Sequence, residues 1–317
     1  MKRIMVTGAL GQIGSELTLF LRKHYGTDHV LATDIRNNSL EVVRSGPFEM
    51  LDVMDGKSFV KAASDFQADT IIHLAALLSA VAEGNPLLAW QMNMGSLLNA
   101  LETARLLKAK FFTPSSIAVF GPPAPKKMTP QASILRPVTM YGINKVSGEL
   151  LADYYFLKYG VDTRGLRFPG LISHATKPGG GTTDYAVEIF YDAIQKGRYT
   201  CYLQEGTSID MMYMPDALQA IIQLLEVDSQ QLKHRNAYNV TGMSFTPKEL
   251  ANEIQKYLPD FSLDYRIDPV RQSIADSWPD QIDASTAKQE WGFTTQYNLE
   301  KMTKDMLEKL TVKLMQS

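Results

Sequence analysis

Cysteine is nearly absent from this sequence of 317 residues, which contains only Cys201. A single cysteine forms neither an intrachain disulfide nor a cysteine-based zinc cluster, and this is typical of a reducing compartment. The five histidines show no spacing typical of metal ligands, so we expect no metal site.

Strong net charge and long apolar runs are also lacking. The chain has 32 Lys and Arg against 34 Asp and Glu, which excludes bulk electrostatic attraction to nucleic acid or to an anionic membrane. No apolar run is long enough to span a bilayer, and a strand pattern begins within the first residues, without a signal peptide before it. We expect a cytoplasmic protein that binds a small molecule, although a mature organellar enzyme would have the same features.

The composition is that of a folded globular chain, with 45% hydrophobic and 21% charged residues. Its length is sufficient for one large domain and a smaller one. No internal repeat or low-complexity tail is evident.

A glycine-rich turn follows the first predicted strand, residues 3–7, and precedes an amphipathic helix that runs to about Tyr25. The first glycine permits a tight turn, the second lets the backbone approach a pyrophosphate, and the third lets the helix pack closely on the strand. The helix N-terminus offers free N–H groups to phosphates. The turn therefore predicts a dinucleotide site formed by Gly8, Gly11, Gln12, Ile13 and Gly14.

The second predicted strand, residues 29–33, ends at Asp34, twenty residues beyond Gly14. This is the spacing of the carboxylate that binds an adenosine ribose, and a carboxylate there repels a 2′-phosphate. We therefore expect NAD in preference to NADP, with Ile35 beside it. Arg36 weakens that preference, and Asp34 as a simple turn residue is the alternative.

Two further predicted strands end beside the same site. Residues 48–51 precede a carboxylate that could reach the adenine amino group, and residues 70–74 run into two alanines. Small residues there let the backbone pass close to a bound cofactor, whereas we predict that His73 is a packed strand residue. The cofactor contacts expected from these strand ends are Asp52, Val53, Leu74, Ala75 and Ala76.

Tyr141 and Lys145 lie four residues apart, which places them on one face of a predicted helix that extends to about Tyr159. A neighbouring ammonium favours the phenolate and lowers the pKa of the tyrosine, so that it can accept a proton from an alcohol. An ordinary surface helix is the alternative. The glycine turn and the upstream pair Ser115–Ser116 favour catalysis.

Six segments, in their order along the chain, resemble the extended short-chain dehydrogenase/reductase family: TGALGQIG, HLAA, NMGS, PSSIAVFG, YGINK and LRFPG. The resemblance implies a doubly wound parallel α/β sheet (a Rossmann fold) with a smaller, interleaved α+β substrate domain. It assigns 1–168 to the dinucleotide-binding domain, with a return segment at about 207–242, and 169–206 and 243–317 to the substrate domain.

The resemblance also implies roles for residues in these motifs. The catalytic residues would be Ser116, Tyr141 and Lys145. Of the two adjacent serines, Ser116 is preferred to Ser115. Tyr141 and Lys145 would also contact NAD, together with Asn93 and Pro169. A homodimer through a four-helix bundle, formed by the helices that carry Asn93 and Tyr141, is expected. Asn93, within a predicted helix over 86–108, would be solvated or would bond a backbone carbonyl.

The substrate half contains a run of three glycines, 179–181, followed by Thr182, Thr183 and Asp184 at the start of a helix. Free N–H groups in such a mobile loop predict a cradle for a small carboxylate. A flexible connection with a threonine N-cap is the alternative. Asp184 is a candidate for binding a substrate ammonium.

Two segments here, PGGGTTDYAVEIF and RQSIADSWPD, resemble the short-chain L-threonine 3-dehydrogenases. The resemblance implies NAD-dependent oxidation of L-threonine to 2-amino-3-oxobutanoate, with Tyr141 as general base. Trp278 would close over the substrate, or else only pack in the core. The substrate contacts it implies are Ser79, Ser116, Tyr141, Gly181, Thr182, Thr183 and Trp278. A nucleotide-sugar epimerase and a non-catalytic NAD-sensing regulator remain alternatives.

Overall fold

The structure is a computed structural model that describes residues 1–37, 41–177 and 179–316. Within these residues, seven parallel strands form a central sheet in the order β10-β6-β5-β4-β1-β2-β3. Strand β1 is buried along its whole length, as expected for a parallel sheet covered on both faces. The strands are β1 (Ile4–Thr7), β2 (Val30–Asp34), β3 (Phe48–Met50), β4 (Thr70–His73), β5 (Lys110–Ser116), β6 (Thr163–Phe168) and β10 (Tyr238–Asn239).

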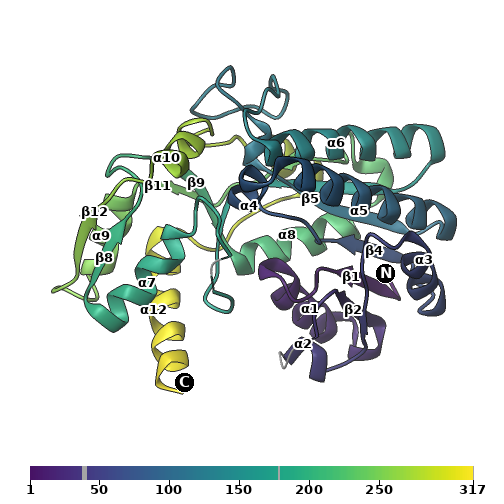
Figure 1. The fold of residues 1–317 in the computed structure, drawn as a ribbon, viewed down its shortest axis with the longest axis horizontal. Helices are drawn as coiled ribbons and strands as arrows, with labels where there is room; N and C mark the ends of the chain where they lie inside the picture. Colours follow the sequence, from purple (N-terminus) through teal and green to yellow (C-terminus); the bar gives the residue numbers. More distant parts are fainter. Residues whose placement is uncertain (38–40, 178, 317) are drawn as a thin grey trace.

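Helices cover both faces of this sheet (Figure 1). One face packs on α3 (Gly56–Asp65), α5 (Pro86–Leu107) and α6 (Met140–Tyr159). The other packs on α1 (Gln12–Tyr25), α8 (Met214–Glu226) and α11 (Ser285–Trp291). Two shorter helices, α2 (Glu41–Arg44) and α4 (Ser79–Gly84), follow β2 and β4. This is the doubly wound α/β fold that the motifs predicted.

The second half of the molecule lies beside the carboxyl ends of these strands (Figure 1). Its strands form a three-stranded sheet, β11-β9-β7, and a two-stranded sheet, β12-β8. They are β7 (Gly170–Ile172), β8 (Arg198–Cys201), β9 (Ile209–Tyr213), β11 (Met243–Phe245) and β12 (Ser262–Tyr265). The helices are α7 (Tyr185–Lys196), α9 (Pro247–Gln255), α10 (Pro269–Asp276) and α12 (Leu299–Met315).

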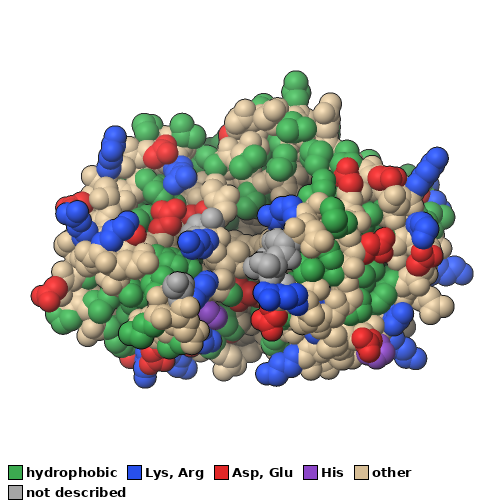
Figure 2. All heavy atoms as spheres, turned by 60° about the horizontal axis from the view of Figure 1, so that its bottom comes forward, with side chains coloured by type: hydrophobic (Ala, Val, Ile, Leu, Met, Phe, Trp, Pro, Cys, Tyr) green, Lys and Arg blue, Asp and Glu red, His purple; other side chains and the backbone are tan. Residues whose placement is uncertain are grey.

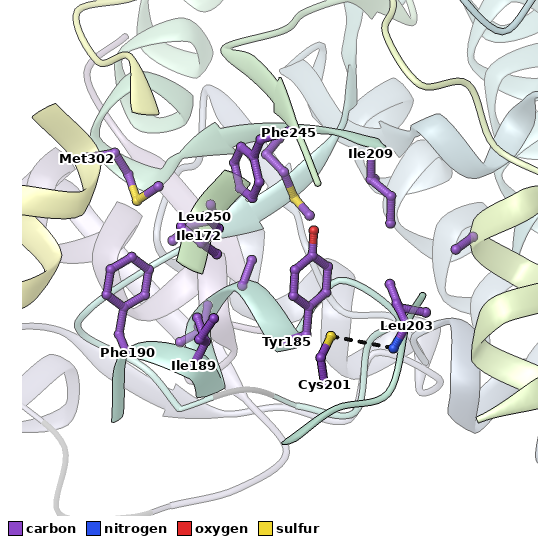
Figure 3. Close-up of a cluster of buried hydrophobic side chains, with 14 of the residues drawn as sticks. Ile172, Tyr185, Ile189, Phe190, Cys201, Leu203, Ile209, Phe245, Leu250 and Met302 are labelled. Atoms are coloured by element: carbon purple, nitrogen blue, oxygen red, sulfur yellow. Dashed lines mark hydrogen bonds between the residues drawn. The ribbon is translucent and has the colours of Figure 1, made fainter. Parts of the chain in front are cut away.

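This half has its own hydrophobic core. Figure 3 shows the rings of Tyr185, Phe190 and Phe245 together with Cys201, all fully buried. The only hydrogen bond drawn there joins the Leu203 N–H to the Cys201 sulfur. Burial raises the pKa of this thiol to about 11, so Cys201 is a packing residue.

The two halves are interleaved. Within the segment 207–242, strand β9 pairs with β7 and β11 of the small sheet. The return is made by α8 and β10, because α8 carries an apolar face that packs on the central sheet. None of the helices described is both long enough and apolar enough to cross a membrane.

Candidate functional site

The turn between β1 and α1 depends on its glycines for steric reasons. Gly8 has φ +67°, and a Cβ on it would lie 2.7 Å from the Ala75 nitrogen. A Cβ on Gly14 would lie 2.2 Å from the Gly8 oxygen. Gly11 is the N-cap of α1 and makes no side-chain capping bond, so the first N–H groups of this 14-residue helix face an open site. The turn therefore fits a pyrophosphate.

Asp34 ends β2 with its side chain only 5% exposed. Its carboxylate accepts hydrogen bonds from the Leu10 N–H at 3.0 Å and from the Arg36 N–H at 3.0 Å. The Arg36 guanidinium donates to the same carboxylate at 3.1 Å. Asp34 thus holds the glycine turn in place, and Arg36 is paired with it, which leaves that cation less able to bind a 2′-phosphate.

A cavity of about 400 Å³ opens beside this turn. Figure 2 shows that the molecule is hollowed near the middle of one face, with Lys and Arg side chains around the hollow. Most of the residues predicted to contact the cofactor line this cavity: Gly8, Gly11, Asp34, Ile35, Asp52, Val53, Leu74, Ala75, Ala76 and Asn93. Gly14 does not, because it packs α1 against the turn. The residues present therefore fit a dinucleotide.

Asn93 is buried on α5 and fixes the chain after β4. Its side-chain oxygen accepts from the Leu77 N–H at 2.8 Å, and its amide donates to the Leu77 carbonyl at 3.2 Å. The same amide donates to the Asn144 side chain at 3.0 Å. Of the two alternatives for Asn93, the structure has the bond to a backbone carbonyl, and the bond to Asn144 joins the cofactor cavity to α6.

A second cavity, of about 150 Å³, adjoins the first, and the two share Leu74, Ala76 and Leu78 as lining residues. It lies between the carboxyl ends of the central strands and the substrate half. The remaining predicted site residues line it: Gln12, Ile13, Ser79, Ser116, Tyr141, Lys145, Pro169, Gly181, Thr182, Thr183 and Trp278. The structure thus brings together residues that lie up to 266 positions apart in the chain (278 minus 12).

Tyr141 lies in the first turn of α6, beside Ser116 at the end of β5. Burial raises the pKa of the Tyr141 phenol to about 12, and its hydrogen bond with Ser116 acts in the opposite direction. Ser116 Oγ also accepts from the Ala118 N–H at 3.2 Å, which fixes the serine rotamer. A phenol and a hydroxyl therefore lie side by side at one end of the small cavity.

Lys145 follows one turn later on α6, and its ammonium lies 5.4 Å from the centre of the Tyr141 ring. The ammonium donates to the Pro114 carbonyl at 2.6 Å. Burial lowers the pKa of Lys145 to about 8, and the charge of Glu149 partly opposes this shift. In this structure burial outweighs the lowering of the Tyr141 pKa that was expected from Lys145, and the Lys145 ammonium is directed at the Pro114 carbonyl.

Glu149 was missed by the sequence analysis. It lies one further turn along α6, is buried, and accepts from the Ser115 hydroxyl. Its carboxylate also forms a bidentate ion pair with Arg167 of β6, with N–O distances of 2.9 and 2.8 Å. The four-residue spacing Tyr141, Lys145, Glu149 was the available signal, since it places all three on one face of a helix.

His73 is a packed strand residue, as predicted. Its ring nitrogens bond the hydroxyls of Thr7 at 2.8 Å and Ser96 at 3.3 Å. Burial first, and the charge of Lys145 second, lower the pKa of His73 to about 3, so the ring is neutral. Within the described ranges, no three His, Cys, Asp or Glu side chains gather as metal ligands.

Hydroxyl and indole groups from the substrate half form the opposite wall of the small cavity. Thr182 is 1% exposed and Trp278 is 5% exposed. The Thr182 hydroxyl and the Trp278 indole N–H are both buried without a hydrogen-bond partner among the described residues. Because a buried polar group without a partner is costly, these two groups are candidate ligand contacts.

The glycine loop differs from its predicted form. The N–H groups of Gly180 and Gly181 both donate to the Asp184 carboxylate at 2.7 Å. These N–H groups were expected to be free to bind the carboxylate of a substrate. That expectation is wrong, because the Asp184 carboxylate already accepts both hydrogen bonds. Burial raises the pKa of Asp184, with these two bonds acting against it. Part of the predicted loop, Pro178, lies outside the described residues.

Comparison with known proteins was consistent along the whole chain. The NAD dependent epimerase/dehydratase family model matches residues 4–241. An uncharacterized epimerase/dehydratase from Staphylococcus haemolyticus is 59% identical over 314 residues, which cover 99% of each chain.

Two solved structures are also similar over nearly the full length. L-threonine dehydrogenase from Clostridium difficile is 60% identical, covers 99% of this chain and 98% of its own, and has a TM-score of 0.97. A monomeric L-threonine 3-dehydrogenase from a metagenome is 44% identical, covers 98% and 99%, and has a TM-score of 0.94.

Proposed function

The chain belongs to the NAD-dependent epimerase/dehydratase family, and we propose that it is an NAD-dependent L-threonine 3-dehydrogenase. The family is the one that the six sequence motifs indicated. The substrate is inferred from the small cavity between Ser116, Tyr141, Thr182 and Trp278, and from the similarity to threonine dehydrogenases of known structure.

The size and charge of this cavity carry the proposal. Its volume of about 150 Å³ is below the usual range for larger organic ligands, roughly 300–1,000 Å³. Lys145 is the only cation among the described residues that line it. A nucleotide-sugar diphosphate needs more space and more positive charge, whereas a zwitterionic amino acid can be held by neutral donors such as Thr182 and Trp278.

The cofactor-side residues would hold the dinucleotide, with the glycine turn against the pyrophosphate and Asp34 at the adenosine ribose. When bound, NAD would supply the acceptor for the hydride that leaves the β-carbon of the substrate. Ser116 donates to the reacting oxygen, on which negative charge develops. Tyr141 accepts the hydroxyl proton, and the product is 2-amino-3-oxobutanoate.

The proton transfer requires a lower pKa for Tyr141 than burial alone provides. At neutral pH a phenol with a pKa near 12 is almost entirely protonated, so little of the phenolate that must accept the proton is present. Positive charge nearby favours the phenolate, and Lys145 supplies it from within the chain. Glu149 stabilises the charged form of Lys145, and in this way it supports the base without touching the substrate.

The decisive experiment measures NADH formation with L-threonine, L-serine and a UDP-sugar in parallel. We expect net NADH only with L-threonine, and a much lower rate with NADP. An epimerase would retain NAD through purification and form no net NADH. A regulator that only senses NAD would bind it without turnover, and either result would overturn the proposal.

We also infer that the chain forms a homodimer through α5 and α6. Both helices carry large apolar side chains that are exposed in the single chain, among them Leu87 at 75%, Leu150 at 64% and Leu157 at 80%. Exposed apolar patches of this kind are typical of interfaces. One similar enzyme of known structure is described as monomeric, so the mass in solution tests this inference. Light scattering should give twice the mass of the chain, and Leu150→Glu should halve it.

A further inference from the structure

The loop between β5 and α6 makes contacts that its position in the sequence does not suggest. It leaves Ser116, crosses to the substrate half, and returns to Tyr141. Its backbone runs parallel to residues 280–283, with a β-bridge between Thr129 and Ile282. The Lys126 carbonyl accepts from the N–H groups of Asp280 at 2.8 Å and Gln281 at 3.2 Å.

The side chain of Lys126 binds the end of α10. Its ammonium donates to the carbonyl of Asp276, the last residue of the helix, and to the carbonyl of Trp278 at 2.6 Å. The last carbonyls of a helix have no partner within it, and a lysine there satisfies them and opposes the negative end of the helix dipole. Lys126 therefore determines where the chain leaves α10.

Trp278 is the residue whose position this contact determines. Trp278 lines the small cavity together with Tyr141, and its indole N–H is buried and lacks a partner among the residues described. The chain has no disulfide that could hold this segment, since Cys201 is its only cysteine. The contacts from the loop join the segment to the half that carries Ser116 and Tyr141, together with the Asn239 side chain of β10, which donates to the Asp283 carbonyl at 3.3 Å.

We propose that Lys126 is a positioning residue for substrate specificity, which holds Trp278 at the distance from Tyr141 that suits a small amino acid. This inference rests on the proposed function and adds a residue to it that does not itself line the cavity. Lys126 acts through the Trp278 backbone. Since Trp278 lines the small cavity and not the larger one, the loss of Lys126 should affect the substrate more than the cofactor.

The test compares Lys126→Met with Lys127→Met, a matched control at the next residue. Each variant replaces a lysine by methionine and so loses one positive charge. Lys127 is exposed and makes no hydrogen bond or ion pair in the described part of the chain. We expect Lys126→Met to raise the KM for L-threonine roughly tenfold, the effect of one charge-assisted hydrogen bond. The turnover number should change less than about threefold and the Kd for NAD should not change. Lys126→Arg should restore most of the affinity, and Lys127→Met should behave as the parent.

A second measurement needs no substrate. In a Trp90→Phe, Trp291→Phe background, Trp278 is the only tryptophan, and acrylamide quenching reports its exposure. Lys126→Met should increase quenching and Lys127→Met should not. Equal KM values in the two methionine variants, or equal quenching, would overturn the inference. If the parent does not oxidise L-threonine, the proposed function fails, whereas the quenching comparison still decides the role of Lys126.

Discussion

The two adjoining cavities are built in opposite ways. The larger one lies beside the glycine turn and the ends of parallel strands, and a Cβ on Gly8 would meet backbone atoms. The far wall of the smaller one consists of loop residues, and two of its polar groups, on Thr182 and Trp278, have no partner in the described structure. The larger site is shaped by backbone geometry, while the smaller one offers side-chain polar groups for a ligand to satisfy.

This difference separates affinity for the cofactor from choice of substrate. A rigid backbone cradle binds any molecule with the right pyrophosphate and ribose, which is why many reactions can be built on one fold. The substrate wall sets the chemistry through a few side chains held by contacts from other parts of the chain. The predictions below change one cavity at a time.

The largest effect is expected at the proposed base, Tyr141, in the smaller cavity. Tyr141→Phe removes only the phenolic oxygen that accepts the substrate proton. Turnover should fall by roughly a hundredfold or more, the usual contribution of a general base. The Kd for NAD, measured by fluorescence titration, should change little. Turnover near that of the parent would remove Tyr141 from the mechanism.

The second test compares a glycine of the turn beside the larger cavity, Gly14, with a glycine of the loop beside the smaller one, Gly180. In Gly14→Ala the new Cβ lies 2.2 Å from the Gly8 oxygen, so α1 must move away from the turn. A Cβ on Gly180 meets nothing within 4 Å, although its φ of +96° makes Gly180→Ala strained. Overpacking costs about 1–3 kcal/mol, and NAD should bind Gly14→Ala at least about tenfold more weakly. Gly180→Ala should bind NAD as the parent does, and equal losses in the two variants would contradict the difference between the sites.

The cofactor side was the more predictable of the two from sequence, and the reason is physical. A glycine turn, a strand and a carboxylate at fixed spacing are local features, so Gly8, Gly14 and Asp34 could be placed before the structure was known. The predicted strands 3–7, 29–33, 48–51 and 70–74 lie within a few residues of β1 to β4, and the helices predicted to end at about Tyr25, 108 and Tyr159 correspond to α1, α5 and α6. Helices α3, α8 and α11 were not predicted.

The substrate side depends on tertiary contacts that spacing does not reveal. The glycine N–H groups were expected to be free, but the Asp184 carboxylate accepts them. Glu149 was missed because its partners, Ser115 and Arg167, come from two other strands.

A third prediction tests the buried charges behind the catalytic lysine. Burial lowers the pKa of Lys145 to about 8 and the negative charge of Glu149 raises it, so Glu149→Gln should lower that pKa further. Lys145 then loses its charge at a lower pH, and the alkaline limb of the kcat/KM profile should move down by roughly one pH unit.

The control for that prediction is Ser115→Ala, which removes a hydrogen bond to Glu149 but leaves its charge. Its alkaline limb should stay in place. Glu149→Gln also breaks a buried ion pair with Arg167, which costs on the order of 3–5 kcal/mol, so profiles are measured well below the Tm of each variant. An unmoved limb in Glu149→Gln would show that Glu149 has only a structural role.

The smallest effect is expected at the substrate wall, where Thr182→Val replaces a hydroxyl by a methyl group of nearly the same size. The Thr182 hydroxyl is buried without a partner in the described structure, so its removal should leave the Tm unchanged or raise it slightly. If it bonds the substrate, the loss of about 0.5–1.5 kcal/mol should raise the KM for L-threonine roughly three- to tenfold.

The matched variant is Thr18→Val. Thr18 also has a buried hydroxyl without a partner among the described residues, but it lies on α1 and lines neither cavity. It should leave the KM unchanged, whereas an unchanged KM in Thr182→Val would mean that the hydroxyl is only an unsatisfied packing group and that other residues select the substrate.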